Sequence, residues 1–121
     1  MRAVLASLIV LSSPVAAQTP DCSDLTTLPQ QSINLCLAQA YQRADAELNV
    51  VYQAARARSS APVPDLLRDT QRAWIPFRDA ACEAEAELMR GGSGEPMMRL
   101  SCLIRLTETR TDELRMFAEM N

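Results

Sequence analysis

Apolar residues recur at steps of three and four along most of the chain, which is the spacing of one face of an α-helix. The three series, which also include a few polar residues, are Ile33, Leu37, Tyr41, Ala44, Leu48, Val51 and Ala55; then Leu67, Thr70, Trp74, Phe77, Ala81, Ala84 and Leu88; then Leu100, Leu103, Thr107, Arg110, Leu114 and Phe117. No useful stretch alternates with the period of two that a half-buried strand shows. The pattern predicts an all-α fold with helices over about 28–59, 64–90 and 96–119.

Helix-breaking residues separate the three series. Ser59–Pro64 holds two prolines, which cannot continue a helix but suit the start of the next one, and the glycines of Gly91–Gly94 end the second helix. Thr27 and Gln30 have the spacing of a capping box at the start of the first helix. Pro76 falls inside the second helix, which it should bend rather than end. Because both turns are short, we expect a small antiparallel three-helix bundle.

The turn centres set the register of the bundle, because facing residues of an antiparallel helix pair have numbers that add to a constant. The constants are about 123 for a first turn near residues 61–62 and about 184 for a second turn near Gly92. They oppose Asp45 to Arg78, Asn49 to Trp74, Tyr52 to Gln71, Cys82 to Cys102 and Trp74 to Arg110. The register therefore predicts an ion pair, a cation–π contact and a disulfide.

The first seventeen residues have the pattern of a secretory signal peptide. Arg2 supplies the positive start, Ala3–Leu11 is an apolar stretch too short to cross a bilayer, and Val15–Ala17 places small residues before a cleavage point. We expect cleavage after Ala17 and a single domain over 18–121 without a membrane span. The expected location is the periplasm or the outside of a bacterial cell.

The expected export favours disulfide bonds between the four cysteines, because oxidising compartments allow disulfides to persist. The chain has no Cys-x-x-Cys pair and no histidine that would favour zinc. We therefore expect two disulfides that staple the bundle. The register favours Cys82–Cys102, which leaves Cys22 to pair with Cys36. The alternative, Cys36–Cys82 with Cys22–Cys102, misses the first register by about five residues, or about 4 Å along each helix.

Composition excludes several functions. Among 121 residues there are twelve arginines, no lysine and no histidine. Triads that use imidazole, lysine Schiff bases and lysine-bearing phosphate loops are therefore absent. The formal net charge of −3 disfavours nucleic acid as a partner. We expect a protein that is not an enzyme and that holds no cofactor or metal.

An ordered set of residues extends over all three predicted helices. It consists of Cys36, Tyr41 and Ala44–Tyr52; then Leu67–Arg68, Gln71–Trp74, Phe77–Asp79 and Cys82; then Gly91–Ser93, Cys102–Leu103, Thr107, Arg110–Thr111 and Leu114. This set resembles the lysozyme inhibitor LprI-like family, long catalogued as a domain of unknown function, over about residues 22–117. Phe77, where many relatives carry tyrosine, and Pro76 depart from the pattern. The resemblance implies export, an all-helical disulfide-bonded fold and inhibition of lysozyme.

Two groups of residues are candidates for a role beyond the core. The first group, interpreted as a polar layer between helices and alternatively as a ligand site, is Asp45, Leu48, Asn49, Tyr52, Gln71, Trp74, Arg78 and Arg110. The second group, a candidate partner-binding surface, is the acidic row Asp79, Glu83 and Glu87 with the loop Gly91, Gly92, Ser93 and Gly94.

These groups lead to a hypothesis about function. An acidic face would attract a basic lysozyme or another basic protein directed at the cell envelope, and the small loop would approach the active cleft of the enzyme. The alternative is a periplasmic binding or envelope-structural module without activity on lysozyme. A redox protein is a third reading, and it requires free thiols.

Overall fold

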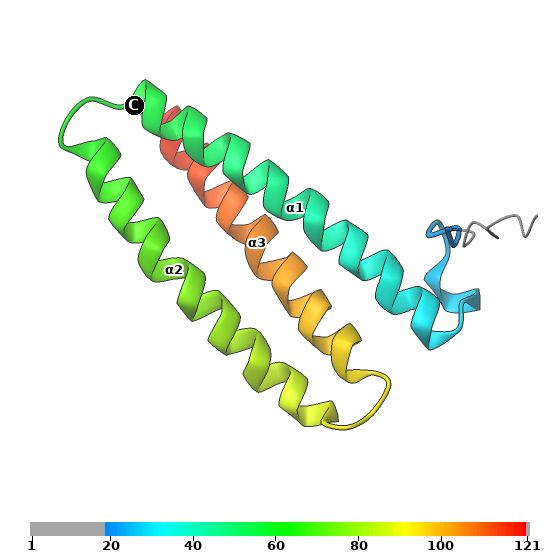
Figure 1. Cartoon of the computed structure of the whole chain (residues 1–121). Coiled ribbons are helices and arrows are strands. Elements are labelled where there is room, and N and C mark those ends of the chain that lie inside the picture. The colour runs from blue at the N-terminus through cyan, green and yellow to red at the C-terminus, as the bar shows by residue number, and fades with distance from the viewer. Residues whose placement is uncertain (1–18, 121) are drawn as a thin grey trace, which may run out of the picture.

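Three long helices make up most of the protein (Figure 1). The computed structural model describes residues 19–120, so the predicted leader lies outside the described part. In chain order the elements are the 3-10 turn η1 (Leu25–Thr27), α1 (Gln30–Arg58), α2 (Val63–Ala86), the 3-10 turn η2 (Glu87–Met89) and α3 (Glu95–Glu119). α2 runs opposite to α1 and α3, and residues 19–120 contain no strand. The predicted all-α three-helix bundle is confirmed.

The start of α1 differs from the predicted capping box. α1 begins at Gln30 behind an extended Pro29, and no side chain caps it. The Thr27 hydroxyl donates to the Asp24 carbonyl at 3.2 Å, and the Gln30 side chain donates to Asn34 at 2.9 Å. The capping prediction was wrong because Thr27 belongs to η1, where its hydroxyl serves that turn instead of the helix.

Prolines lie at the start of α2 and inside it. Pro62 directly precedes α2 and Pro64 lies in its first turn, where a missing backbone N–H leaves no hydrogen bond unmade. The Ala61–Pro62 peptide bond is cis. Pro76 lies inside α2 without ending the helix. α2 ends at Ala86, short of the predicted residue 90, and continues as η2.

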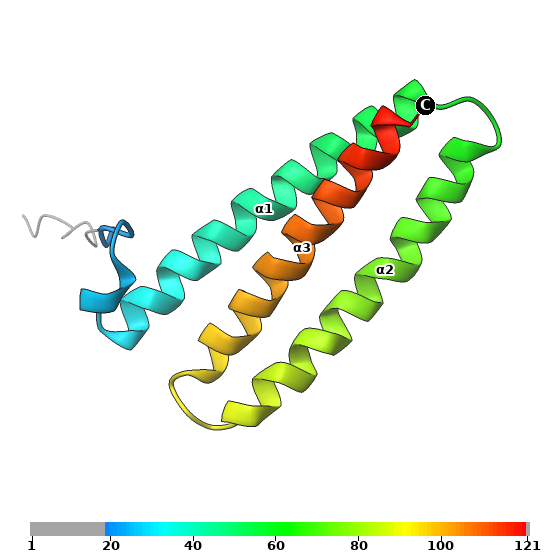
Figure 2. The same ribbon diagram turned by 180° about the vertical axis from the view of Figure 1, so that it is seen from behind.

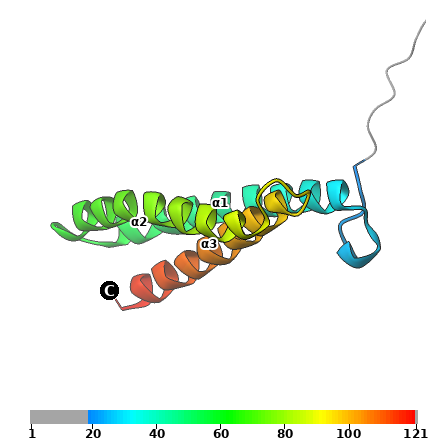
Figure 3. The same cartoon turned by 90° about the horizontal axis from the view of Figure 1, so that it is seen from below.

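α3 holds the bundle together. It packs against both other helices, most extensively against α1, whereas α1 and α2 touch at few points. Seen from behind, α3 lies in front of the other two helices (Figure 2), and from below it runs at an angle to them (Figure 3). Within residues 19–120, no third helix covers the face of the α1–α2 pair that is turned away from α3.

The apolar core is small and lies toward the α1–α2 turn. Its buried members are Leu48, Ala55, Leu67 and Leu114. Around them pack the partly buried side chains of Val51, Tyr52, Val63, Trp74, Phe117 and Ala118. Because a domain of this size buries a limited core, covalent cross-links contribute strongly to its stability.

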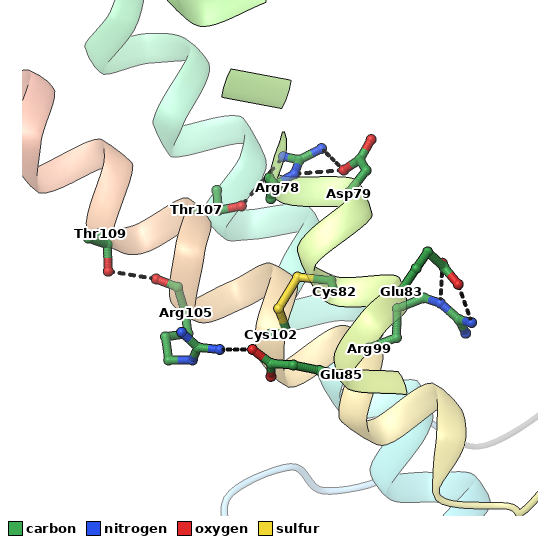
Figure 4. Close-up of a disulfide and its surroundings, with 10 residues drawn as sticks. All are labelled: Arg78, Asp79, Cys82, Glu83, Glu85, Arg99, Cys102, Arg105, Thr107 and Thr109. Atoms are coloured by element: carbon green, nitrogen blue, oxygen red, sulfur yellow. Dashed lines mark hydrogen bonds and ion pairs between the residues drawn. A yellow bond between two sulfur atoms is a disulfide. The ribbon is translucent and has the colours of Figure 1, made fainter. Parts of the chain in front are cut away.

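Two disulfides staple the bundle, as predicted. Cys22 pairs with Cys36 and Cys82 pairs with Cys102, with Cα atoms 5.6 and 5.4 Å apart. The alternative pairing is excluded, and residues 19–120 contain no free cysteine. Cys82–Cys102 joins α2 to α3 (Figure 4), whereas Cys22–Cys36 ties the segment before α1 to α1 itself. No helix within residues 19–120 has the length and hydropathy to cross a bilayer.

Candidate functional site

A buried arginine organises the middle of the bundle. Arg78 of α2 is 6% exposed, and its guanidinium carbon lies 5.2 Å from the centre of the Trp74 ring and 5.6 Å from that of Tyr41. Arg78 forms ion pairs with Asp45 of α1 at 3.3 Å and with Asp79 at 2.9 Å. Such partners are what a buried cation requires. The pair with Asp45 is the one that the hairpin register predicted.

A second arginine connects this cluster to α3. Arg110 lies 6.0 Å from the centre of the Trp74 ring, and its Nε donates to Gln71 at 3.1 Å. This cation–π contact was also predicted from the register. Arg78 in turn donates to the Thr107 hydroxyl of α3 at 3.5 Å. Polar side chains of all three helices thus form one connected network.

An open groove lies between α1 and α2, on the face turned away from α3. It encloses about 500 Å³. Its lining residues are Tyr41, Asp45, Leu48, Asn49, Tyr52, Gln53 and Arg56 from α1 and Arg68, Gln71, Arg72, Ile75 and Arg78 from α2. Most of the predicted polar layer therefore lines a groove, whereas Trp74 and Arg110 meet on the side of α3.

Ion pairs neutralise some of the groove's arginines. Arg78 has the two carboxylates described above, and Arg68 pairs with Asp65 and Asp69 at 3.0 Å each. The Asp69 carboxylate raises the pKa of Arg68, chiefly through a hydrogen bond. Arg56 and Arg72, the other two lining arginines, make no ion pair within residues 19–120.

Tyr41 at the edge of the groove is held as a hydrogen-bond donor. Burial raises the pKa of its hydroxyl, an effect that Arg78 opposes and that Asp45 and Asp79 reinforce. The phenol is therefore protonated at neutral pH, and its O–H group is able to donate.

The loop between α2 and α3 is fixed by contacts with side chains of α1 and α3. Gly91 has a φ of 76°, in the left-handed region that glycine adopts readily, and its amide donates to the Glu95 carboxylate at 2.9 Å. Asn34 of α1 donates to the Ser93 carbonyl at 3.2 Å. Gly92 is exposed together with Gly91 and Ser93, so the tip of the loop is small, ordered and accessible.

An arginine of α3 braces the base of this loop. Arg99 pairs with Glu83 at 2.7 Å, as Figure 4 shows, and with Glu95 at 3.1 Å. The hydrogen bond from Arg99 lowers the pKa of Glu83. The Gly91 amide, and then Arg99, lower the pKa of Glu95. Gly94, the last residue of the loop, is buried against Met89.

The acidic row along α2 and the start of η2 is exposed, but its charges already have partners. Asp79 is paired with Arg78 and Glu83 with Arg99, and Glu87 pairs with Arg90 at 2.6 Å. Arginines therefore neutralise the row locally. Long-range attraction to a basic partner must therefore come from the net charge of −3.

Comparison with protein families places these features in context. The description of the matching family is lysozyme inhibitor LprI, and the match covers residues 22–114, which include parts of all three helices and both disulfides. The chain belongs to the LprI family. The resemblance drawn from the sequence motifs is confirmed.

Two proteins with similar sequences come from Rhizobium meliloti and Escherichia coli. The chain is 37% identical over 128 residues to the uncharacterized protein R02472 of Rhizobium meliloti (strain 1021), covering 95% of this chain and 92% of that protein. It is 35% identical over 101 residues to the uncharacterized protein YecT of Escherichia coli (strain K12), covering 70% of this chain and 62% of YecT. No solved structure matches the chain.

Sequence reasoning identified Arg78 but missed the other three arginines that line the groove of this LprI-family protein. Arg56, Arg68 and Arg72 lie outside the first group of candidates, because each reads as an ordinary solvent-exposed helix position. The register constant of about 123 places Arg56 opposite residue 67 and Tyr52 opposite Gln71. Arg68 and Arg72 lie one turn apart on α2. Together with the register constant, this spacing brings them near Arg56 of the first helix, which was a signal for a cationic groove.

Proposed function

We propose that this protein is an exported inhibitor that binds a lysozyme and blocks its active cleft. The family match over residues 22–114 is the observation that carries the proposal. Two disulfides support export, because such bonds persist mainly in oxidising compartments. The predicted signal peptide adds to this support, and the proposed location is the periplasm or the cell exterior.

The loop at Gly91–Ser93 is the part best suited to enter a cleft. Its small residues offer little steric resistance, and the contacts from Asn34, Glu95 and Arg99 order it before binding. An ordered loop loses less conformational entropy when it binds. Leu88, 79% exposed beside the loop, supplies apolar surface for the same contact.

The carboxylates Asp79, Glu83 and Glu87 complete the proposed surface. Asp79 and Glu83 lie on α2 and Glu87 begins η2, and all three are exposed, so basic groups of a lysozyme are able to reach them. Because each already has an arginine partner, docking exchanges one ion pair for another and yields little net energy. In this proposal the loop supplies the affinity and the carboxylates orient the complex.

A cell-wall clearing assay tests the proposal. The full-length gene is expressed with its leader, and the protein recovered from the periplasm is mixed with lysozymes of several types. Slower clearing by at least one type is expected, and mass spectrometry of the same sample is expected to show cleavage after Ala17. Unchanged clearing by every type, at an excess of folded protein, overturns the inhibitor function.

A pair of variants tests the loop. Ser93→Tyr adds bulk at the exposed tip, and Ser60→Tyr adds the same bulk at the exposed α1–α2 turn at the other end of the bundle. We expect Ser93→Tyr to weaken inhibition by at least about tenfold, a loss of about 1.4 kcal/mol. Ser60→Tyr is expected to inhibit like the unaltered protein. Equal inhibition by both variants excludes the loop as the contact.

The α1–α2 groove favours a second candidate function. A periplasmic binding module needs a concave site with polar groups that converge on a ligand, and the groove has that form. A folded protein that inhibits no lysozyme but binds a ligand in the groove supports this alternative.

A further inference from the structure

We propose that the α1–α2 groove is a binding site for a small ligand that bears a carboxylate, such as an acidic sugar or an acidic peptide. This goes beyond the proposed inhibition of lysozyme, for which the loop between α2 and α3 is the contact. The groove is lined by α1 and α2 only and includes no residue of that loop.

Two cations in the groove lack a carboxylate. Arg72 is exposed and makes no hydrogen bond or ion pair with any residue in 19–120. Arg56 uses its Nε to donate to the Pro64 carbonyl at 3.1 Å, and its guanidinium lies 5.6 Å from the centre of the Tyr52 ring. Its two terminal nitrogens still have hydrogens to donate. A guanidinium fork of this kind matches the geometry of a carboxylate.

Four neutral polar groups in the groove are also uncommitted. The hydroxyls of Tyr41 and Tyr52 and the side-chain amides of Asn49 and Gln53 form no hydrogen bond within residues 19–120. Asp45 supplies the carboxylate of the lining, and it is bound to Arg78 at 3.3 Å. The hydroxyls and amides both donate and accept, so the excess of donors in the groove comes from the guanidinium N–H groups of Arg56 and Arg72. This excess suits a ligand rich in carboxylate, carbonyl and hydroxyl oxygens.

Size and rigidity fit a small ligand. A volume of about 500 Å³ lies within the range of small-molecule sites, which is about 300–1,000 Å³. The groove wall includes Arg78 and Gln71, which the network toward α3 holds through Thr107 and Arg110. A wall fixed in this way does not need to be ordered by the ligand.

Two matched ligand pairs test the chemistry by titration calorimetry on the whole exported protein. N-acetylmuramic acid and N-acetylglucosamine differ by a lactyl group that carries a carboxylate, and the peptides Ala-Glu-amide and Ala-Gln-amide differ by a side-chain carboxylate. We expect the acid of at least one pair to bind at least about tenfold more tightly than its neutral counterpart. The pair that shows the difference identifies the source of the carboxylate. Equal binding or no binding within both pairs overturns the proposal.

A pair of arginine variants locates the site. Arg72→Gln removes an unpaired cation from the groove, and Arg43→Gln removes an exposed cation of α1 that lies outside the groove and makes no ion pair within residues 19–120. The expected loss of affinity for the acid is about tenfold in Arg72→Gln and none in Arg43→Gln. Because both positions are exposed, both variants should fold. Equal losses in the two variants show nonspecific attraction and contradict the assignment.

Discussion

Arg78 joins the core, the polar network and the groove through one side chain. Its guanidinium contacts two aromatic rings, two carboxylates and the Thr107 hydroxyl. From the sequence, Asp45 is the partner expected across the hairpin, so removing Asp45 should leave Arg78 unpaired. The structure changes that expectation, because Asp79 also binds the guanidinium. A one-residue separation on a helix normally points two side chains apart, and only the length of arginine allows this contact.

The first prediction compares the two ends of this ion pair. Arg78→Ala should lower the free energy of unfolding by about 2–4 kcal/mol, because it empties the space between Tyr41 and Trp74 and unpairs Asp45. Asp45→Ala should cost about 1 kcal/mol or less, since the Asp45 side chain is 43% exposed and Asp79 remains. Urea denaturation of the two variants measures both values. A larger loss in Asp45→Ala would show that Asp79 does not compensate.

At the scale of helices, periodicity predicted the elements but not their neighbours. The apolar spacing identified all three helices, and the second turn centre identified Cys82–Cys102. The same pattern could not show that α3 packs mainly against α1 and that α1 and α2 touch at few points. An apolar face indicates that a helix packs against another element, but it does not indicate which one. The groove followed from this packing. Asn49, Tyr52 and Gln71 have the same spacing whether they fill a helix interface or line an opening.

The second prediction concerns the two disulfides. Replacing Cys82 and Cys102 by serine should lower the free energy of unfolding by about 3 kcal/mol, because the bridge closes a 20-residue separation between α2 and α3. Replacing Cys22 and Cys36 should instead loosen the segment before α1 and leave α2 and α3 protected. Hydrogen exchange measured by mass spectrometry distinguishes a local loss of protection from a global one. Faster exchange throughout α3 in the Cys22/Cys36 variant would contradict this division.

The third prediction is that acid weakens the end of the bundle that carries the loop. The pKa values of Glu83 and Glu95 are lowered in the folded protein from an ordinary 4.5. Their contribution to stability is therefore complete above that value and is lost as the pH falls through the lower folded pKa values. Urea midpoints measured between about pH 7 and pH 3 should fall at the acid end.

A pair of glutamine variants provides the control for the acid effect. Glu83→Gln should reduce the fall in midpoint, because the carboxylate that Arg99 binds is gone. Glu119→Gln removes an exposed carboxylate that makes no ion pair within residues 19–120, so its midpoints should follow those of the unaltered protein. The same acid dependence in Glu83→Gln and the unaltered protein would place the titrating groups elsewhere.

On the scale of the whole molecule, the two candidate surfaces lie in different places. The loop is at the end where α2 meets α3 (Figure 1). The groove runs along α1 and α2, and its lining includes Arg56 and Arg68 near the α1–α2 turn. Ion pairs and a nearby disulfide make the loop rigid. The groove is open because α1 and α2 touch at few points. A protein and a small acid are therefore able to bind without competing for the same residues.

The fourth prediction follows from the charge of the whole molecule. With the predicted leader removed, eleven arginines face fifteen carboxylates, a net charge of −4. Because arginines neutralise the acidic row locally, attraction to a basic lysozyme acts at long range and should mainly speed association. Raising the salt from about 0.01 M to about 0.15 M shortens the Debye length from about 30 Å to about 8 Å and should slow association severalfold, with little change in dissociation. Surface plasmon resonance measures both rates, and a salt effect confined to dissociation would instead identify Asp79, Glu83 and Glu87 as direct ion-pair partners of the enzyme.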